Sequence, residues 1–237
     1  MPEHGKRYKT VIDLIEKSKS YEATEAVVLL KKMATAKFDE TVELHIRLGL
    51  DPKNSQQQVR GVALLPHGLG KSVRIAVFAQ GEAQRIAEQA GADFAGGDDL
   101  IKKIEDGWTD FDVSIAVPEL MGKVGKLGKI LGRKGLMPNP KSGTVVGPDD
   151  LPRAISDARK GRVEFKLDRA AIIHVPIGKA SFDESKLVDN LTAVIDAIVR
   201  AKPAGAKGQY IKSANINSTM GPGIALDLRI VLTAKAA

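Results

Sequence analysis

The chain has 237 residues, of which 43% are hydrophobic and none is cysteine, and 36 lysines and arginines against 29 aspartates and glutamates give a formal charge of +7. This composition supports real hydrophobic cores and excludes disulfides, thiolate metal sites and a cysteine nucleophile. No secretion signal or membrane span is predicted, a reducing cytoplasm fits best, and the excess of positive charge favours a polyanionic partner, nucleic acid first.

The first part of the chain predicts helices and then strands. Apolar residues at helical spacing indicate two amphipathic helices, at residues 8–18 and 22–36. Strict alternation of apolar and polar side chains over residues 41–48 indicates a half-buried strand, and residues 59–65 are a second strand candidate. A turn rich in proline and glycine at residues 66–70 ends this part.

The middle of the chain changes its pattern, because short apolar strands alternate there with helical stretches. Strands are predicted at 73–79, 92–95 and 113–117, and helices at 82–89, 98–106, 119–131 and 150–159. Such alternation is typical of βαβ units around a parallel sheet. Amphipathic strands then return at 162–167, 171–177, 210–217 and 226–232, together with a long helix at 183–201.

The charge is distributed unevenly between the middle and the ends. Residues 67–159 hold 13 basic and 13 acidic side chains, so the whole excess of +7 belongs to the two ends. We therefore predict a mixed fold, α/β and α+β, in two domains. The terminal segments, 1–66 plus 160–237, would form one discontinuous, basic α+β domain. The middle, 67–159, would be an α/β domain inserted at surface turns, since the ends of a compact domain often lie close together.

Glycines and cations interleave densely between residues 119 and 141, where six basic side chains accompany one acidic side chain. Two interpretations stay open. Leu120 and Val124 begin a helical apolar stripe, which indicates a core-packed helix whose glycines let a neighbour approach closely. The same helix could instead present its cations to phosphates. Residues 122–125 also match the GXXG clamp of KH domains, but two glycines at that spacing are common.

The segment 212–223 is predicted to be a strand that runs into a tight loop. The Thr219 hydroxyl could bond a ribose 2′-hydroxyl, Met220 could pack on a ribose or base, and Gly221 would let the backbone approach RNA. An ordinary polar hairpin end is the alternative. Phe38 leaves a similar choice between core and binding surface. With only ten aromatic residues in the chain, folded RNA is favoured over a single strand stacked on aromatic rings.

No catalytic site, metal site or cofactor is predicted. Gly70-Lys71-Ser72 resembles the end of a P-loop, but leucine occupies position 65, where the motif needs glycine. The aspartate pairs at 98–99 and 149–150 begin helical stretches, so helix capping explains them better than acid–base catalysis. The four histidines lack metal-ligand spacing. A nucleotide-binding enzyme is therefore the weaker alternative, and the protein is not expected to be an enzyme.

Six segments, taken in order, resemble the bacterial ribosomal protein L-one family, the proteins of the mobile stalk of the large ribosomal subunit. They are Ala36-Lys-Phe-Asp-Glu-Thr41-Val-Glu, Leu65-Pro-His-Gly-Leu-Gly-Lys71, Ala90-Gly-Ala-Asp93 with Gly96-Gly97, Leu131-Gly-Arg-Lys-Gly-Leu-Met-Pro-Asn-Pro140, Gly178-Lys-Ala-Ser-Phe182 and Ser218-Thr-Met-Gly-Pro222. The resemblance spans nearly the whole chain. It implies that the terminal segments bind rRNA and that the middle is a Rossmann-like, three-layer α/β domain.

The resemblance also implies two sets of contact residues. Those that would contact large-subunit 23S rRNA, and equally a messenger RNA, are Lys37, Phe38, Thr41, Lys166, Arg169, Ser213, Thr219, Met220 and Gly221. Those on the basic face that the inserted domain would turn toward tRNA are Lys123, Lys126, Lys129, Arg133 and Lys134.

The function implied by the resemblance is that of a stalk protein which assists release of deacylated tRNA from the exit site of the large ribosomal subunit. The free protein, expected as a monomer, would repress translation by binding its own operon mRNA. Its location would be the cytoplasmic ribosome, with no membrane partner. A regulatory RNA-binding protein outside the ribosome is an alternative that the sequence does not separate, and residues 224–237 carry no readable motif.

Overall fold

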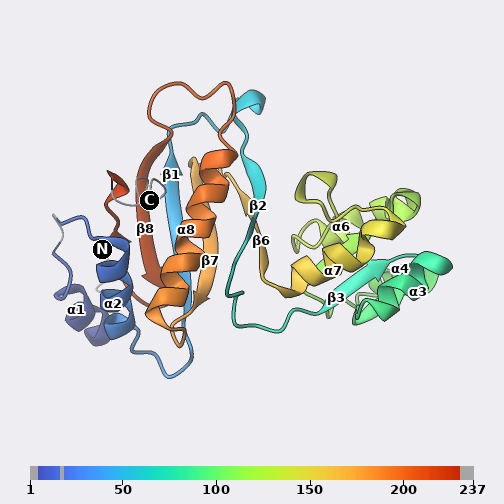
Figure 1. The fold of residues 1–237 in the computed structure, drawn as a ribbon, viewed down its shortest axis with the longest axis horizontal. Helices are drawn as coiled ribbons and strands as arrows, with labels where there is room; N and C mark the ends of the chain where they lie inside the picture. The colour runs from blue at the N-terminus through green and yellow to red at the C-terminus, as the bar shows by residue number, and fades with distance from the viewer. Residues whose placement is uncertain (1–4, 17–18, 230–237) are drawn as a thin grey trace. The chain divides into compact units, whose positions relative to one another are not determined.

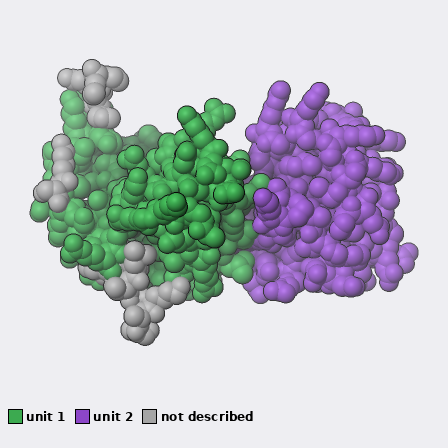
Figure 2. Space-filling view, turned by 90° about the horizontal axis from the view of Figure 1, so that it is seen from above, with its two compact units in different colours: residues 1–70, 163–237 green, residues 71–162 purple. Residues whose placement is uncertain are grey.

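The computed structural model describes residues 5–16 and 19–229, which form two compact units. Unit 1 combines Met1–Gly70 with Val163–Ala237, and unit 2 is Lys71–Arg162 (Figure 2). The apolar side chains of unit 1 form one core cluster, and those of unit 2 form two clusters on the two sides of a sheet. The predicted mixture of α/β and α+β structure is confirmed.

Segments from both ends of the chain share one antiparallel sheet in unit 1, with the strand order β7-β1-β8-β9 (Figure 1). The strands are β1 (Thr41–Leu48), β7 (Ile172–Lys179), β8 (Ile211–Ser218) and β9 (Ile224–Ala225). In the centre of the sheet, His45 of β1 is paired with His174 of β7 and with Asn215 of β8. The N-terminal and C-terminal segments therefore fold as one body.

Helices cover one face of this sheet. They are α1 (Lys6–Ile12), α2 (Ala23–Met33) and α8 (Glu184–Arg200). The alternation in β1 explains the arrangement, because Val42, Leu44, Ile46 and Leu48 are buried in the same core as apolar side chains of α2 and α8. The intervening side chains of β1, from Thr41 to Arg47, project from the opposite face, where they are half-buried or exposed.

Two further short elements complete unit 1. A separate two-stranded sheet pairs β2 (Arg60–Leu64) with β6 (Arg162–Lys166), and a 3-10 turn lies at η1 (Ser55–Gln57). Phe165 of β6 is buried, and its ring would lie 2.6 Å from a Cβ at Gly61 of β2, so a glycine at that position is required by packing.

Unit 2 is a three-layer arrangement around a parallel sheet of strand order β4-β3-β5. The elements are β3 (Ile75–Phe78), β4 (Phe94–Gly96), β5 (Val113–Ala116), α3 (Glu82–Gln89), α4 (Asp98–Glu105) and α7 (Leu151–Arg159). Ala76 and Phe78 point into a core with α4, whereas Ile75 and Val77 point into a core with α3 and α7. Burial on both faces explains why this strand reads as a continuous apolar run.

One predicted helix, at residues 119–131, is interrupted in the structure. The segment consists of η2 (Pro118–Leu120), α5 (Met121–Val124), η3 (Gly125–Leu127) and α6 (Gly128–Leu131). Its apolar stripe is nevertheless buried at Leu120, Val124, Leu127 and Leu131. The stripe therefore predicts burial correctly, while glycine at every third position lowers helix propensity and favours 3-10 turns. Further 3-10 turns are η4 (Pro140–Ser142) and η5 (Pro148–Asp150).

The two ends of the described chain also differ from the prediction. The first helix ends at Ile12 instead of residue 18, and of its predicted length residues 17–18 lie outside the described part. The strand predicted at 226–232 is wrong where it is described, because Leu226 makes only a single bridge to Tyr21 and residues 228–229 are helical. Residues 230–232 lie outside the described part. Within the described residues, no helix has the length and apolar character needed to cross a membrane.

Candidate nucleic-acid interface

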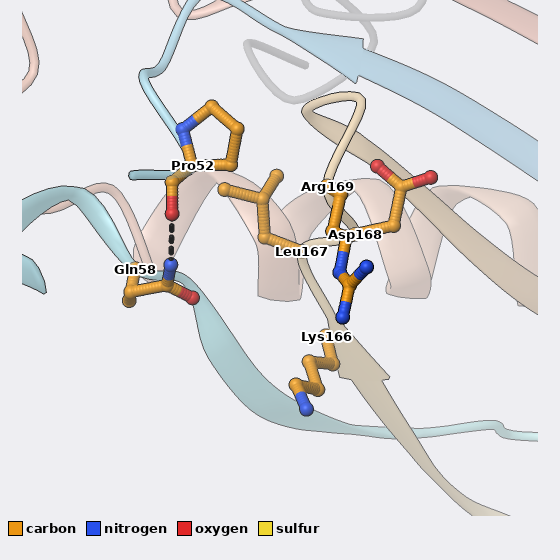
Figure 3. A pocket seen from close by; sticks show the side chains of 6 residues that line it. All are labelled: Pro52, Gln58, Lys166, Leu167, Asp168 and Arg169. Atoms are coloured by element: carbon orange, nitrogen blue, oxygen red, sulfur yellow. Dashed lines mark hydrogen bonds between the residues drawn. The ribbon is translucent and has the colours of Figure 1, made fainter. Parts of the chain in front are cut away.

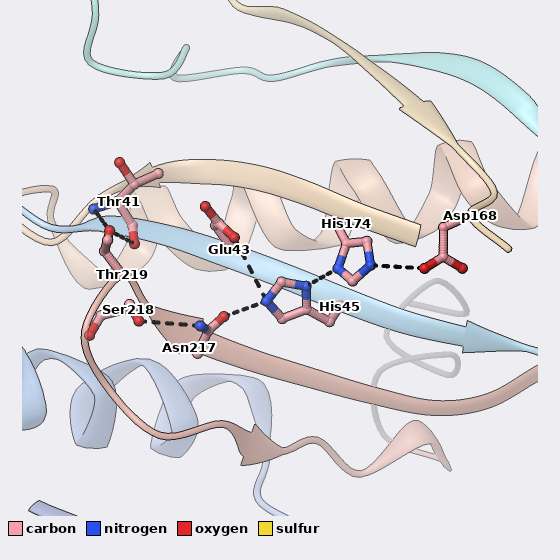
Figure 4. A network of polar contacts seen from close by, with 8 residues as sticks. All are labelled: Thr41, Glu43, His45, Asp168, His174, Asn217, Ser218 and Thr219. Carbon is pink, nitrogen blue, oxygen red and sulfur yellow. Dashed lines mark hydrogen bonds and ion pairs between the residues drawn. The ribbon is translucent and has the colours of Figure 1, made fainter. Parts of the chain in front are cut away.

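Two loops meet at one end of the unit 1 sheet. The Phe38 loop (residues 34–40) precedes β1, and the Met220 loop (residues 218–221) follows β8. The Thr41 N–H donates to Thr219 Oγ1 at 2.9 Å (Figure 4). The Thr219 N–H donates back to the Thr41 carbonyl at 3.0 Å. Antiparallel pairing of β1 with β8 thus joins two predicted contact residues that are 178 positions apart in sequence.

Large apolar side chains are exposed on both loops. Phe38 is 55% exposed and Met220 is 51% exposed, and Lys37 and Thr219 beside them are exposed as well. The alternative that placed Phe38 in the core is therefore wrong. Exposed apolar side chains flanked by hydroxyl and ammonium groups provide a surface that can pack on ribose or base and bond to sugar or phosphate.

Glu40 joins the two loops from below and was not among the predicted contact residues. Only 2% of it is exposed, and its carboxylate accepts the Ala36 N–H and the Met220 N–H, each at 2.9 Å. The buried Ser218 hydroxyl also interacts with this carboxylate, but more weakly, since among the described residues its oxygen has no hydrogen-bond partner at full geometry. A glutamate that follows Phe38 and precedes a strand gives no sequence signal of this role.

The pKa of Glu40 reflects these contacts. Burial by itself raises the pKa of the carboxyl group, but hydrogen bonds from Ser218, Met220 and Ala36, with the nearby Arg7 charge, outweigh burial and leave the pKa below its ordinary value. The loops are therefore joined by an ionised carboxylate at neutral pH.

Gly221 is needed for packing within the Met220 loop. A Cβ at this position would lie 2.6 Å from Ser218 Oγ, which is buried. The sequence suggested that glycine lets the backbone approach RNA at this position. Packing is a second reason for glycine here, because a larger residue would displace the end of β8.

Lys166 and Arg169 lie at the other end of the sheet. Both are exposed, and both line an open hollow with Pro52, Gln58, Leu167 and Asp168 (Figure 3). Asp168 fixes this turn by accepting the Ile172 N–H at 2.7 Å and the Ala170 N–H at 2.8 Å. These bonds lower the pKa of Asp168, and the bond from Ile172 has the larger effect. The Leu48 N–H donates to the Ala171 carbonyl, so the turn adjoins the end of β1.

The exposed face of the sheet connects the two ends. Half-buried or exposed side chains on this face include Thr41, Glu43, His45 and Arg47 of β1, His174 of β7, and Ser213, Asn215 and Asn217 of β8. From Thr41 to Arg47 the strand covers about 20 Å at roughly 3.3 Å per residue. Ser213 is paired with Arg47, so it lies on this face far from the Met220 loop.

A chain of polar contacts crosses this face (Figure 4). His45 Nδ1 lies 2.7 Å from His174 Nδ1, His45 Nε2 lies 2.6 Å from Asn217 Oδ1, and His174 Nε2 lies 3.4 Å from Asp168 Oδ2. The alternation in β1 predicts that His45 lies on the exposed face, but only the pairing of β1 with β7 brings it to His174.

In unit 2, the five predicted tRNA-facing cations are all exposed along one segment, residues 123–134. Lys123 forms an ion pair with Asp98 at 2.7 Å, and Lys134 donates to Thr109 Oγ1. The other three, Lys126, Lys129 and Arg133, have no ion-pair partner within the described chain. The charges of these three side chains are therefore accessible to solvent.

The glycines between these cations are not explained by packing within the chain. A Cβ at Gly122, Gly125 or Gly128 would meet no described atom within 4 Å, and none of the three has a positive φ. The interpretation that these glycines admit a close neighbour is therefore wrong for the described chain, although the apolar stripe is packed as predicted. Each glycine costs about 1 kcal/mol of helix stability relative to alanine.

The aspartate pairs have a different role from the one predicted. The N-cap of α4 is Gly97, so Asp98 and Asp99 lie in the first turn and make no capping hydrogen bond. Asp150 is the N-cap of α7, again without a side-chain capping bond. The capping prediction is wrong in detail, but carboxylates at these helix starts still interact favourably with the helix dipole. No three or more histidine, aspartate or glutamate side chains among the described residues are grouped to hold a metal ion.

Comparison with known proteins decides the family. A family model described as "Ribosomal protein L1p/L10e family" matches residues 30–222. This chain belongs to that family. Two curated relatives from different strains of Dehalococcoides mccartyi, each named "Large ribosomal subunit protein uL1", are 64% identical over 231 residues, which is 98% of this chain and 98% of each relative. A relative of the same name from a third strain is 62% identical over the same share.

The family match confirms the predicted resemblance and covers both loops of unit 1. It begins within α2, at residue 30, and ends at residue 222, directly after the Met220 loop. The residues that follow, from Gly223 on, lie outside it.

Proposed function

We propose that this chain is a protein of the large ribosomal subunit and that unit 1 binds folded 23S rRNA. Membership in the family and the names of the relatives support assembly with the large subunit. The observation that carries the proposal for rRNA is the meeting of the Phe38 and Met220 loops, which exposes two large apolar side chains beside hydroxyl and ammonium groups. Surfaces of this kind read the sugars and shape of folded RNA.

Unit 1 would make two kinds of contact with RNA, one to ribose and base and the other to phosphate. Thr219 and the adjoining backbone would bond ribose hydroxyls, while Phe38 and Met220 would pack on ribose or base and supply specificity. Lys37 would neutralise phosphates beside the loops. Lys166 and Arg169, beside the turn that adjoins the far end of β1, would do so at the other end of the sheet. Ser213 would contact the RNA that crosses the exposed face between them.

A filter-binding assay tests the rRNA proposal. The full chain is titrated against overlapping 23S rRNA fragments, with an unrelated folded RNA of equal length as the control, at several salt concentrations. We expect one fragment to bind at least 100-fold more tightly than the control, with an affinity that falls as salt rises. Equal affinity for every RNA would show that only the net charge of +7 acts.

A deletion tests whether unit 1 carries this activity alone. A short linker replaces residues 71–162, which removes unit 2 and leaves both loops and the complete β7-β1-β8-β9 sheet. We expect affinity for the 23S fragment to stay within about threefold of the full chain, because unit 1 has its own core. A folded deletion variant that does not bind would refute the assignment of rRNA binding to this domain.

We further propose that unit 2 is the part of the stalk that contacts exit-site tRNA. Lys126, Lys129 and Arg133, exposed and without an ion-pair partner among the described residues, and the solvent-facing glycines beside them support a surface open to a phosphate backbone. Release of deacylated tRNA from ribosomes reconstituted with the full chain, compared with ribosomes carrying the deletion variant, measures the effect. Equal release rates would contradict this role.

The same unit 1 surface is proposed to bind the chain's own operon mRNA when the protein is free, as a monomer. One surface for both RNAs predicts mutual competition between the leader mRNA and the 23S fragment. It also predicts that a loop variant weakens both by a similar factor. Simultaneous binding of both RNAs would refute a shared site, and sedimentation above 25.4 kDa without RNA would refute the monomer.

A further inference from the structure

We propose that Glu40 is the positioning residue of the rRNA surface: its buried carboxylate holds the Phe38 loop and the Met220 loop in one arrangement, so that both contact RNA together. The inference rests on the proposed rRNA binding of unit 1. It assigns Glu40 no contact with RNA, because only 2% of the residue is exposed.

The contacts of Glu40 are divided between the two loops. Oε1 accepts the Ala36 N–H at 2.9 Å and Oε2 accepts the Met220 N–H at 2.9 Å, so each oxygen serves a different loop. The Ala36 contact closes the Phe38 loop on itself over four residues, whereas the Met220 contact spans 180 residues of sequence. One side chain thus holds the backbone of Met220 itself and the backbone of the Phe38 loop two residues before Phe38.

A carboxylate is the side chain that this site requires. The groups around it are two N–H donors and one hydroxyl, and none of the three needs a hydrogen from residue 40. An ionised glutamate accepts only, through two oxygens. A glutamine of the same shape would turn its NH₂ group against one N–H donor, and that donor would be buried without a partner.

The burial of this charge also fits an RNA surface. A carboxylate exposed between two RNA-contacting loops would repel phosphates. Beneath the loops, its charge is balanced by the N–H dipoles of Ala36 and Met220 and by the nearby Arg7 charge. Glu40 thus orders the two loops without placing a negative charge on the RNA-binding surface.

The first experiment compares Glu40→Gln with a matched control. Asp112→Asn in unit 2 also removes the charge of a carboxylate that accepts a backbone N–H, from Arg74 at 3.1 Å. Asp112 is half-buried, forms ion pairs with Lys71 and Arg74, and adjoins neither loop. Affinity for the 23S fragment is measured at low temperature, on samples whose amide spectra show unit 1 folded. We expect about a tenfold loss for Glu40→Gln and less than a twofold change for Asp112→Asn.

Each outcome decides between positioning and a merely structural role. A structural glutamate would lower the melting temperature but leave the affinity of the folded protein unchanged. A folded Glu40→Gln variant that binds within twofold of the wild type would therefore overturn the inference. If the unaltered chain does not bind any 23S fragment, the proposed function itself fails, so the two failures are distinguishable.

The second experiment uses the unaltered chain and does not depend on a variant that folds. The backbone amide resonances of Ala36 and Met220 are followed while the pH is lowered from neutrality. We expect both to move together with one midpoint below the ordinary glutamate value of 4.5, because both donate to the same carboxylate. Independent midpoints, or no movement before global unfolding, would overturn the inference.

Other charged groups near Glu40 must be separated in that titration. They are Arg7 of α1, Lys37 and Asp39 of the Phe38 loop, and Lys179 of β7, which is paired with Thr41. Asp39 is the other carboxylate among these four residues, and it accepts hydrogen bonds from the N–H and the hydroxyl of Ser181. Repeating the titration with Asp39→Asn should leave the common midpoint in place.

Discussion

The loop surface of unit 1 and the cationic segment of unit 2 are built in opposite ways. In unit 1, the residues come from distant parts of the chain, and the fold requires their identity: Glu40 accepts donors from both loops, and Gly221 has no room for a Cβ. In unit 2, the cations are close in sequence, and Gly122, Gly125 and Gly128 have open space around them. A preorganised surface suits recognition, whereas a solvated cationic segment supplies attraction that needs little geometry.

The largest effect should come from a negative charge placed on the preorganised surface. Met220→Asp is expected to weaken binding of the 23S fragment by about 100-fold, because it removes apolar contact and repels phosphate. The control is Leu64→Asp, since Leu64 of β2 is 54% exposed and lies outside both loops. Filter binding measures both variants, and an equal loss in the two would mean that the surface is not local to the loops.

The second largest effect is expected from replacing glycine by alanine, which should be harmful in the Met220 loop and harmless in the cationic segment of unit 2. Gly221→Ala is expected to weaken binding of the 23S fragment about tenfold, because its Cβ would displace Ser218, 2.6 Å away. Gly125→Ala should leave that affinity unchanged and stabilise unit 2 by about 1 kcal/mol in thermal unfolding. A destabilised Gly125→Ala variant would show that the segment does not have the space that the structure gives it.

Neutralising Lys126, Lys129 and Arg133 should weaken the electrostatic attraction of tRNA without changing recognition of the 23S fragment by unit 1. The triple variant Lys126→Gln, Lys129→Gln and Arg133→Gln is expected to reduce the slope of log affinity for tRNA against log salt by about 2 to 3. Binding of the 23S fragment should remain within twofold of the wild type. An unchanged salt slope for tRNA would remove this segment from the proposed tRNA contact.

The smallest effect concerns stability in acid. Because the pKa of Glu40 is lowered in the folded protein, its contribution to the free energy of unfolding is present above the ordinary value of 4.5 and is lost as pH falls through the lowered pKa. Glu40→Gln should therefore unfold with a shallower pH dependence below about pH 4.5. Denaturant titrations at several pH values measure this, and parallel curves for variant and wild type would count against it.

Local patterns predicted most of the elements. The alternation at 41–48 has the same bounds as β1, and the helix predicted at 82–89 has the same bounds as α3. The pattern failed at 119–131, where an apolar stripe predicted burial but not the breaks that glycines introduce, and at 226–232, where an apolar run does not pair as a strand. Burial follows side-chain spacing, whereas regular hydrogen bonding also depends on backbone propensity and on available partners.

The candidate site was predictable only in part. The family resemblance named Phe38 and Met220, and the structure shows both exposed. Glu40 stands in one of the matching segments but was not among the contact residues, and its two N–H donors, one of them 180 residues away, meet only in the fold. The His45–His174 contact likewise exists only through strand register. Long-range contacts of this kind cannot be predicted from the local sequence, because no pattern around either residue indicates its partner.

The sequence by itself determined the family, the class of fold, the surplus of positive charge at the two ends and the side chains that face the cores, because these follow from residue identity and spacing. Tertiary structure decided which loops meet, which carboxylate is buried between them and which glycines have no room for a side chain. Those properties depend on the pairing of β1 with β8, and hence on the packing of the whole unit that sets this register.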